Sequence, residues 1–287
     1  MSGGVARALK AAEDRLSACS PSARLDARLL LAHAMGVEAA RVPISADSAL
    51  SDAAALRLES ALGRRLSGEP VSRILGRRAF WTLDLAITPD VLDPRPDSEA
   101  VVEAVLARLG TRDGALSLLD FGTGSGCLLL ALLAELPHAW GLGVDRSQAA
   151  LRVAATNAAA HGLARRARFL ASDWDAALSW RYDVIVSNPP YLADREIETL
   201  APEVRGYDPR LALSGGADGL EAYRKLLPAL RRRLAPGGFA VLEVGAGQAA
   251  AVAEIARQSD VIHIGSQYDL AGIERAVVLQ ARHGTAC

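Results

Sequence analysis

The sequence predicts an α/β protein with a mostly parallel seven-stranded sheet whose last strand is antiparallel, preceded by a small all-α domain. From residue 115 onward, continuous apolar runs alternate with helical stretches, which is typical of parallel strands covered on both faces. The last two runs, "VIHIGSQYD" and "ERAVVLQA", are too close for a helical crossover and should be antiparallel neighbours. Residues 1–78 instead carry apolar side chains at helical spacing.

Two helices dominate residues 1–78. The first, in "SARLDARLLLAHAMG", should end at a left-handed Gly36. The second, in "LSDAAALRLESALGRRLSGEP", should be capped by Ser51 and stopped by Gly68 and Pro70. The apolar faces predicted for the two helices consist of Leu25, Leu29, Leu30, Ala32 and Met35, and of Leu56, Leu62 and Leu66.

Residues 79–99 read as a hairpin around Leu83–Ile87 followed by a proline-rich linker. Asp97 or Ser98 could cap the next helix, "EAVVEAVLARL". Residues 100–287 then form the larger domain, in which the four strands "ALSLLDFG", "WGLGVD", "ARFLASD" and "YDVIVSNPP" precede the strand "GGFAVLEVG" and the final pair.

The chain of 287 residues has a net charge of −1, which argues against nucleic-acid binding through a uniformly basic surface. Residues 1–78 carry a net charge of +4 and the remainder −5, so the helical domain is the better candidate for an acidic partner. Three distant cysteines, Cys19, Cys127 and Cys287, predict reduced thiols. With no signal-like or membrane-spanning run, we expect a cytoplasmic protein.

A glycine-rich loop follows the first strand of the larger domain. In "LDFGTGSGC", Gly122, Gly124 and Gly126 allow tight turns and close approach of a ligand at a helix N-terminus. The second strand ends in Asp145, whose carboxylate could accept hydrogen bonds from a ribose diol. A purely structural turn is the alternative, which the placement of Asp145 disfavours. Dinucleotide binding would require a glycine at position 127, where the chain has Cys127, and the G-x-G-x-G pattern suits S-adenosylmethionine.

Asp173 and Trp174 follow the third strand at the same predicted sheet edge. The carboxylate could accept the adenine amino hydrogen, and the indole could pack on the ring. A core aromatic is an equally good interpretation of Trp174. The five histidines have no metal-ligand spacing, so no metal is expected.

The fourth strand ends in Asn188-Pro189-Pro190-Tyr191. The prolines fix φ, so the Asn188 side-chain carbonyl and the Pro189 backbone carbonyl could converge on one NH₂ group, with Tyr191 as a flat wall. A planar NH₂ is a poor nucleophile, and two directed acceptors would orient it and stabilise the charge that develops on nitrogen. Methyl transfer to it needs no separate general base.

The glycine loop, Asp145, "SDW" and "NPPY" together resemble Rossmann-like class I S-adenosylmethionine-dependent methyltransferases that act on planar nitrogen. Four further stretches, at residues 68–85, 93–99, 207–220 and 269–278, resemble the HemK/PrmC family of peptide chain release factor glutamine methyltransferases. They read "GEPVSRILGRRAFWTLDL", "DPRPDSE", "YDPRLALSGGADGL" and "DLAGIERAVV".

The resemblance implies methylation of the side-chain amide nitrogen (N5) of the Gly-Gly-Gln glutamine in class 1 release factors, an event of translation termination. It implies a catalytic and substrate-binding set, Asn188, Pro189, Pro190 and Tyr191. It implies a cofactor-binding set, Gly122, Thr123, Gly124, Ser125, Gly126, Asp145, Asp173, Trp174 and Asn188. The helical domain would dock the release factor. We expect a monomer that binds neither nucleic acid nor membrane.

The chain departs from the family pattern "IPRPDTE" at two positions: Asp93 replaces isoleucine, which puts the linker packing in doubt, and Ser98 replaces threonine but keeps the hydroxyl. Three alternatives compete with this function. A ribosomal-protein glutamine methyltransferase would carry a linker nearer to "PRSP". A nucleic-acid amino-group methyltransferase would need a basic groove. A non-enzymatic cofactor-binding module would not need the intact Asn188–Tyr191 set.

Overall fold

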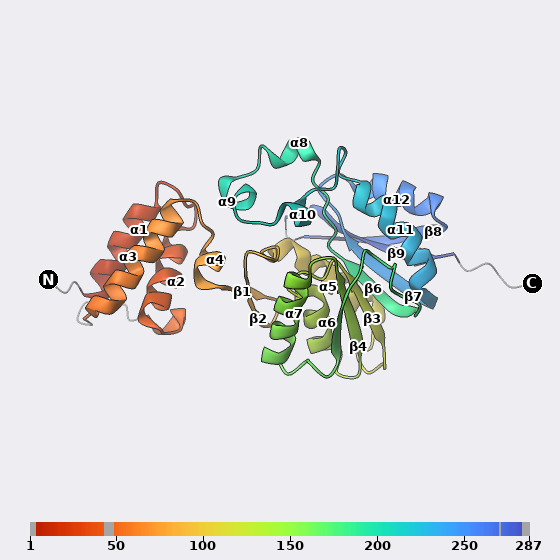
Figure 1. Ribbon diagram of the computed structural model, residues 1–287, viewed down its shortest axis with the longest axis horizontal. Coiled ribbons are helices and arrows are strands. Elements are labelled where there is room, and N and C mark those ends of the chain that lie inside the picture. The colour runs from red at the N-terminus through yellow and green to blue at the C-terminus, as the bar shows by residue number, and fades with distance from the viewer. Residues whose placement is uncertain (1–3, 43–48, 270, 283–287) are drawn as a thin grey trace, which may run out of the picture. The chain divides into compact units, whose positions relative to one another are not determined.

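The computed structural model describes residues 4–42, 49–269 and 271–282. It divides into two compact units (Figure 1). The helical unit comprises residues 1–77 together with Ala201–Tyr207, and the α/β unit comprises residues 78–200 and 208–287. The first boundary is close to the predicted one at residue 78, but the assignment of Ala201–Tyr207 to the helical unit was not predicted.

The helical unit contains α1 (Val5–Leu16), α2 (Ala23–Met35), the 3₁₀ turn η1 (Ala39–Arg41), α3 (Asp52–Leu66), α4 (Val71–Leu75) and the short α9 (Pro202–Arg205). The predicted caps are confirmed. The Ser51 hydroxyl accepts a hydrogen bond from the Ala54 backbone N–H at 3.3 Å. Gly36 ends α2 with a φ of 69°, and Gly68, with a φ of 90°, follows the end of α3.

The predicted apolar faces of α2 and α3 were partly wrong. In α2 the buried stripe is Ala27, Leu30, Leu31 and Ala34, whereas Leu25 is 56% exposed. In α3 Leu58 and Leu62 are buried, whereas Leu56 and Leu66 are 73% and 42% exposed. Both buried stripes follow the i, i+3, i+4, i+7 spacing of a helix packed on one side. The helices carry more leucines than one face can bury, so their presence alone did not identify the face.

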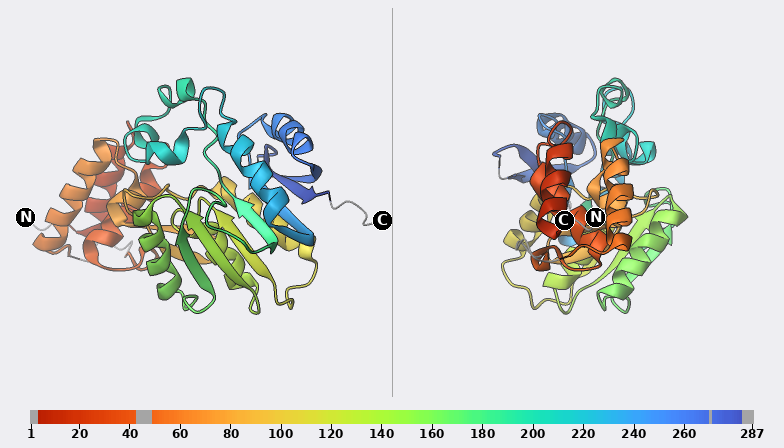
Figure 2. Two further views of the ribbon diagram at one scale, coloured as in Figure 1. Left: turned by 45° about the vertical axis from the view of Figure 1, so that its right-hand side comes forward. Right: turned by 90° about the vertical axis from the view of Figure 1, so that its left-hand side faces the viewer.

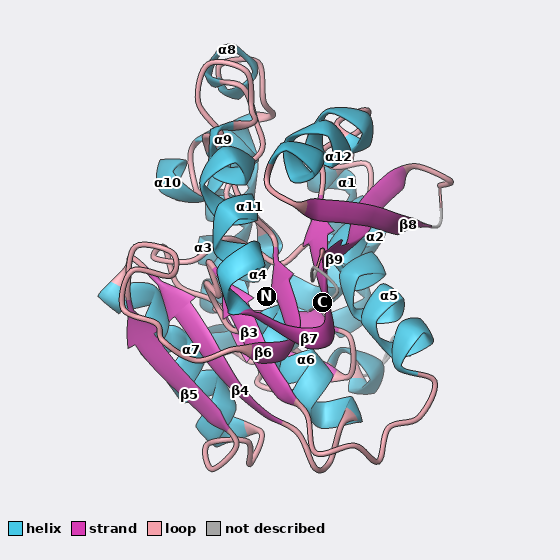
Figure 3. Ribbon diagram, turned by 90° about the vertical axis from the view of Figure 1, so that its right-hand side faces the viewer, coloured by secondary structure: helices cyan, strands magenta, loops and turns pink. Residues whose placement is uncertain are grey.

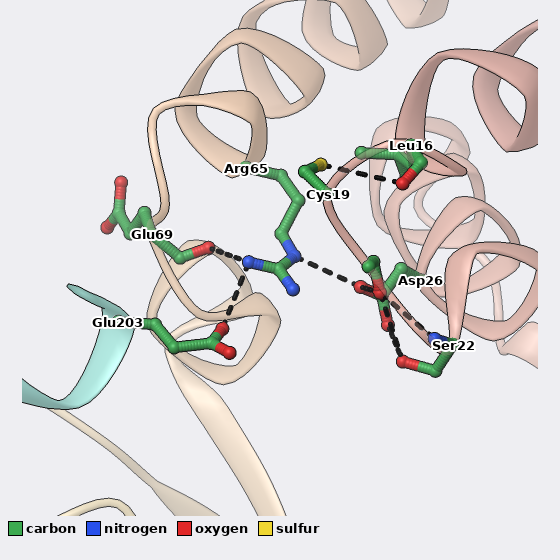
Figure 4. Close-up of polar contacts among 8 residues, drawn as sticks. Leu16, Cys19, Ser22, Asp26, Arg65, Glu69 and Glu203 are labelled. Atoms are coloured by element: carbon green, nitrogen blue, oxygen red, sulfur yellow. Dashed lines mark hydrogen bonds and ion pairs between the residues drawn. The ribbon is translucent and has the colours of Figure 1, made fainter. Parts of the chain in front are cut away.

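A charged residue, Arg65, occupies the last position of the α3 stripe. Its side chain is only 7% exposed, and its Nε donates to Oδ2 of Asp26 at 3.0 Å (Figure 4). The hydroxyls of Ser20 and Ser22 also donate to that carboxylate, at 2.8 and 2.9 Å. The guanidinium reaches Glu203 of α9 at 3.0 Å, which explains why Ala201–Tyr207 belongs to this unit.

The α/β unit contains a seven-stranded twisted sheet (Figure 2). Its strand order is β5-β4-β3-β6-β7-β9-β8. Only β9 is antiparallel to its neighbours, as predicted. The strands are β3 (Ser117–Phe121), β4 (Trp140–Asp145), β5 (Ala167–Ala171), β6 (Tyr182–Ser187), β7 (Leu234–Glu243), β8 (Val261–Tyr268) and β9 (Glu274–Ala281).

Helices cover both faces of the sheet (Figure 3). On one face lie α5 (Glu99–Leu109), α6 (Cys127–Glu135) and α7 (Gln148–Ala160); on the other lie α11 (Glu221–Arg233) and α12 (Ala249–Gln258). Successive strand residues feed opposite cores: Leu118 packs with α5 to α7, and Leu119 with α11 and α12. The short helices α8 (Asp194–Ile197) and α10 (Arg210–Leu213) lie between β6 and α11 in the chain.

The linker forms the predicted hairpin, with β1 (Arg77–Phe80) and β2 (Leu83–Ala86), and then the 3₁₀ turn η2 (Pro96–Ser98). Asp93 is buried, and its carboxylate lies 3.7 Å from Arg78 Nε, so the unusual charge is compensated. Ser98 stands at the N-cap of α5, but its side chain makes no capping hydrogen bond. Cys19 and Cys127 are free thiols, and Cys287 lies outside the described residues.

Replacing Arg65 should destabilise the helical unit. Arg65→Met leaves the buried Asp26 carboxylate without its countercharge, which should cost about 3 kcal/mol of unfolding free energy. Arg64→Met is the matched control, because Arg64 is exposed and its ion pair with Glu69 should be worth less than about 1 kcal/mol. Hydrogen exchange of the α1 to α3 amides measures both. Equal protection in the two variants would contradict a stabilising role for the buried pair.

Candidate active site

A pocket opens where three neighbouring parallel strands end. In the sheet register Phe121 of β3 lies opposite Val144 of β4 and Ser187 of β6, so the residues that follow them emerge at one edge. The pocket is lined by residues of the glycine loop, of the ends of β4 and β6, and of the linker. Of the predicted site residues its lining includes Gly122, Thr123, Gly124, Ser125, Asp145, Trp174, Asn188 and Pro190.

The glycine loop has the backbone that its sequence predicts. Gly122, Gly124 and Gly126 have φ values of 69°, 55° and 84°, a region that side-chain-bearing residues rarely adopt. A Cβ at Gly126 would lie 3.1 Å from Leu130 and 3.3 Å from Ala154, so this glycine also allows α6 and α7 to pack closely. Gly126 therefore supports the loop from outside the pocket lining.

Two carboxylates stand beside the loop. Asp145 accepts the Gly124 backbone N–H at 3.0 Å and the Ser147 N–H at 2.9 Å, so it ties the ends of β3 and β4 together. Asp120 accepts the Thr123 hydroxyl at 2.7 Å, whereas its Oδ1 has no hydrogen-bond partner among the described residues. Burial raises the pKa of Asp120 to about 7. Asp120, which sequence reasoning missed, is a buried carboxyl in the pocket lining.

Trp174 lines the pocket and also packs on the core, whereas its packing on adenine stays a prediction. Its ring meets Phe121 edge to face at a centroid distance of 6.1 Å. Asp173 is placed differently. Its side chain is 65% exposed, pairs with Arg146 at 3.6 Å and is not part of the pocket lining. A contact between Asp173 and adenine therefore remains a prediction.

Asn188 is held in a defined orientation at the end of β6. Its Nδ2 donates to the Ser98 hydroxyl at 3.0 Å, and no described residue donates a hydrogen bond to its Oδ1. The Pro189 carbonyl likewise receives no hydrogen bond from a described residue. Tyr191 is half-buried against the core, and burial raises its pKa, so the phenol is neutral at physiological pH. Pro189 and Tyr191 lie next to the pocket but are not among its lining residues.

The segment 213–219 packs directly on this turn. Leu192 N–H donates to the Leu213 carbonyl at 3.1 Å, and Gly215 N–H to the Leu192 carbonyl at 2.8 Å. A Cβ at Gly215 would lie 2.8 Å from the Pro190 carbonyl oxygen, and one at Gly219 would lie 2.4 Å from that of Tyr191. Larger side chains would therefore push the turn out of place.

Gln248 is another contact that sequence reasoning missed. Its Nε2 donates to the Tyr191 carbonyl at 2.9 Å, and its Oε1 accepts the Gly245 N–H at 3.1 Å. Gln248 thereby links the turn after β6 to the loop after β7. The only sequence signal was its place in the loop between the strand that ends at Glu243 and the next helix, in "EVGAGQ".

Ion pairs attach the linker to the same site. Arg95 bonds Asp208 at 2.6 Å, and the Asp208 carboxylate also accepts the Asp93 backbone N–H at 3.3 Å. Arg275 of β9 lies 3.0 Å from Asp97 and 2.9 Å from Asp269. These pairs join separate stretches of sequence around the pocket, so the linker is a structural part of the site.

The fold and the site define a class of protein. The sheet has seven strands, one of them antiparallel, with a glycine loop after β3 and a carboxylate at the end of β4. These features are typical of class I methyltransferases, which use S-adenosyl-L-methionine as methyl donor. Residues 98–204 match the family described as "Methyltransferase small domain", and residues 7–76 match "PrmC N-terminal domain".

Full-length relatives identify the family. The chain is 48% identical to the release factor glutamine methyltransferase of Rhodospirillum rubrum, over 90% of this chain and 79% of the relative. It is 46% identical to the enzyme of the same name from Cereibacter sphaeroides, over 95% and 96% of the two chains. The chain belongs to the release factor glutamine methyltransferase family.

Solved structures agree on the fold. The catalytic domain of human Mettl16 in complex with an RNA hairpin matches with a TM-score of 0.56 at 16% identity, over 82% of this chain and 84% of that one. The Thermus thermophilus 16S rRNA methyltransferase RsmC, in complex with AdoMet and guanosine, matches with a TM-score of 0.52 at 21% identity, over 72% and 50%. At these identities the likeness concerns the fold alone.

Asp145 and Asp173 should differ in their effect on cofactor affinity. Asp145→Ala removes the acceptor that holds Gly124 and lines the pocket, so the Kd for S-adenosylmethionine should rise at least tenfold. Asp173→Ala should change the Kd by less than threefold, because the carboxylate is exposed and outside the lining. Isothermal titration calorimetry measures both. A larger loss of affinity in the Asp173 variant would support the predicted adenine contact.

Proposed function

We propose that this enzyme methylates the side-chain amide nitrogen (N5) of the glutamine in the Gly-Gly-Gln motif of class 1 release factors and thereby modulates translation termination. The observation that carries the proposal is the orientation of Asn188. Its amide nitrogen is bound to Ser98, which leaves Oδ1 as an acceptor at the pocket. The release factor glutamine methyltransferases to which the chain is similar support the choice of substrate.

The turn after β6 suits a carboxamide. A glutamine side chain ends in a planar NH₂ with two hydrogens, and Asn188 Oδ1 and the Pro189 carbonyl are two acceptors on consecutive residues. Both should hold the NH₂ with its nitrogen facing the methyl donor. The prolines keep the backbone of this turn rigid, and Gly215 and Gly219 pack against it. The turn is therefore organised before the substrate arrives.

The chemistry required of the protein is modest. S-adenosylmethionine supplies an electrophilic methyl group. As the N–C bond forms, the bond between the methyl group and the donor sulfur would break, and S-adenosylhomocysteine would leave with that electron pair. Positive charge would develop on the amide nitrogen, and the two acceptors would stabilise it electrostatically. The nitrogen then loses one hydrogen as a proton, which its raised acidity allows without a dedicated base. Gly122, Gly124, Asp145 and Trp174 would hold the cofactor, and Asp120 is a buried carboxyl in the same lining.

The helical unit is the proposed docking domain for the release factor, and its excess positive charge fits that role. We further propose that the enzyme acts as a monomer in the cytoplasm without binding nucleic acid. Across residues 4–42, 49–269 and 271–282, no helix combines the length and apolar character that a membrane span requires. In the same residues, no three His, Cys, Asp or Glu side chains are grouped to hold a metal ion.

Labelled methyl groups should appear on a single release factor residue. The purified enzyme, with S-adenosylmethionine carrying a labelled methyl group, should modify a class 1 release factor at its Gly-Gly-Gln glutamine, as read by peptide mass spectrometry. A release factor with that glutamine replaced by alanine is the control and should remain unlabelled. Labelling of that control, or of ribosomal protein or nucleic acid in its place, would overturn the proposed function.

Asn188→Ala should lower kcat by about 10²–10³-fold, by analogy with the loss of one oxyanion-hole donor. The variant should still bind S-adenosylmethionine, because the glycine loop and Asp145 remain. Single-turnover transfer to the release factor and calorimetric cofactor binding measure the two effects. Unchanged turnover would exclude Asn188 from the reaction.

A further inference from the structure

A serine from the linker controls which atom of Asn188 faces the pocket. Ser98 is 1% exposed and is separated from Asn188 by 90 residues of sequence. Its hydroxyl accepts the Asn188 Nδ2 hydrogen at 3.0 Å, and it makes no capping bond with α5. A hydroxyl that accepts one hydrogen bond still has its own hydrogen to donate. If another group receives that hydrogen, the Ser98 hydroxyl can only accept a hydrogen bond from Asn188.

Glu243 is placed to receive it. In the parallel register Leu242 of β7 lies opposite Ser187 of β6, so Glu243 and Asn188 follow at the same level of the sheet. Glu243 is 1% exposed, and its Oε2 has no hydrogen-bond partner among the described residues. Its backbone carbonyl accepts the Tyr223 hydroxyl at 2.9 Å, which fixes the end of the strand. A buried acceptor therefore lies one strand away from the turn.

Several neighbouring groups shift the pKa of the Glu243 carboxyl. Burial raises the pKa of Glu243 to about 7, whereas the hydroxyls of Ser98 and Tyr191 lower it. Arg275 of β9 also lowers this pKa, and Asp97 of η2 raises it. The neutral Cys127 and Tyr223 complete the surroundings. The strand register places Glu243 level with Asn188, which Ser98 binds, and the hydroxyls of Ser98 and Tyr191 are among the groups that act on its carboxyl.

We propose that Ser98 and Glu243 are positioning residues that fix the side-chain amide of Asn188 with Oδ1 toward the substrate. Glu243 takes the hydrogen of the Ser98 hydroxyl, so Ser98 presents only a lone pair and selects the Nδ2 side of the amide. This inference rests on the proposed function. Without Ser98 and Glu243, the side-chain amide of Asn188 could flip. Its NH₂ group would then face the NH₂ group of the substrate, and two hydrogen-bond donors would oppose each other.

The preference of Ser98 for Nδ2 of Asn188 also predicts a pH dependence of kcat. Ionised Glu243 can only accept, whereas the protonated carboxyl can donate its own hydrogen to Ser98 and release the preference for Nδ2. Because the pKa of Glu243 is raised to about 7, kcat should fall as the pH drops below about 7. Glu243→Gln should lower kcat and remove this acidic limb of the profile.

The test compares Ser98→Ala with Ser98→Thr. The alanine variant should lose about 10–100-fold in kcat for methyl transfer to the release factor, with KM and S-adenosylmethionine affinity within about twofold. The threonine variant keeps the hydroxyl and should retain activity within about threefold. Ser117→Ala is the matched control: it removes another buried hydroxyl, bonded to Asp183 at the opposite end of β3, and should leave kcat unchanged.

A double-mutant cycle tests whether Ser98 acts through Asn188. Because Ser98 positions Asn188, the Ser98→Ala, Asn188→Ala double variant should be no slower than Asn188→Ala alone. Full additivity, wild-type turnover in Ser98→Ala, or equal losses in the alanine and threonine variants would overturn the inference. If Asn188→Ala turns over normally, the proposed site itself fails. If only Asn188→Ala is impaired, the proposed function stands and the inference about Ser98 falls.

Discussion

The parallel pairing of β6 with β3 on one side and β7 on the other is the constraint on which the rest of the site depends. Ser187 lies opposite both Phe121 and Leu242, so Gly122, Asn188 and Glu243 lie at one level of the sheet edge. Side chains alternate between the two faces of a strand, so a slip of one residue would turn Asn188 away from the glycine loop. Two apolar cores, one on each face, oppose that slip.

The sequence predicted what depends on local patterns. The central strands are buried on both faces and therefore read as continuous apolar runs. Residues at the carboxyl ends of strands, such as Asp145 and Asn188, were identified as site residues for that reason. The capping residues Ser51 and Gly36 follow the same local logic. In parallel α/β sheets the carboxyl ends of the strands lie at one edge, so a prediction of where the strands end also predicts where the site lies.

Contacts between distant segments could not be predicted. Asp97 or Ser98 was expected to cap the next helix, because both residue types are common N-caps; the bond from Asn188 to Ser98 exists only after the linker packs against β6. Arg65 sits in a buried stripe that pattern reasoning reserves for apolar residues, and its partner Glu203 is 138 residues away. The exposed Leu25 and Leu56 show the same limit, since tertiary packing chose the buried face of each helix.

The stretches that carry the family resemblance touch one another. Arg95 and Asp97 of the linker pair with Asp208 and Arg275, and Gly215 packs on the turn after β6. These stretches lie far apart in the sequence but come together around one site in the fold. Asp93, the unusual linker residue, fits because Arg78 compensates its charge.

The assignment of α9 to the helical unit has a consequence for the exchange of this unit by recombination. The chain crosses between the units at residues 77, 200 and 207, so the smaller unit is encoded by two separate parts of the gene. A recombination event with a single junction after residue 77 would exchange Arg65 but leave Glu203 behind. A segment that ends at residue 77 therefore lacks Glu203, one of the two carboxylates that pair with Arg65.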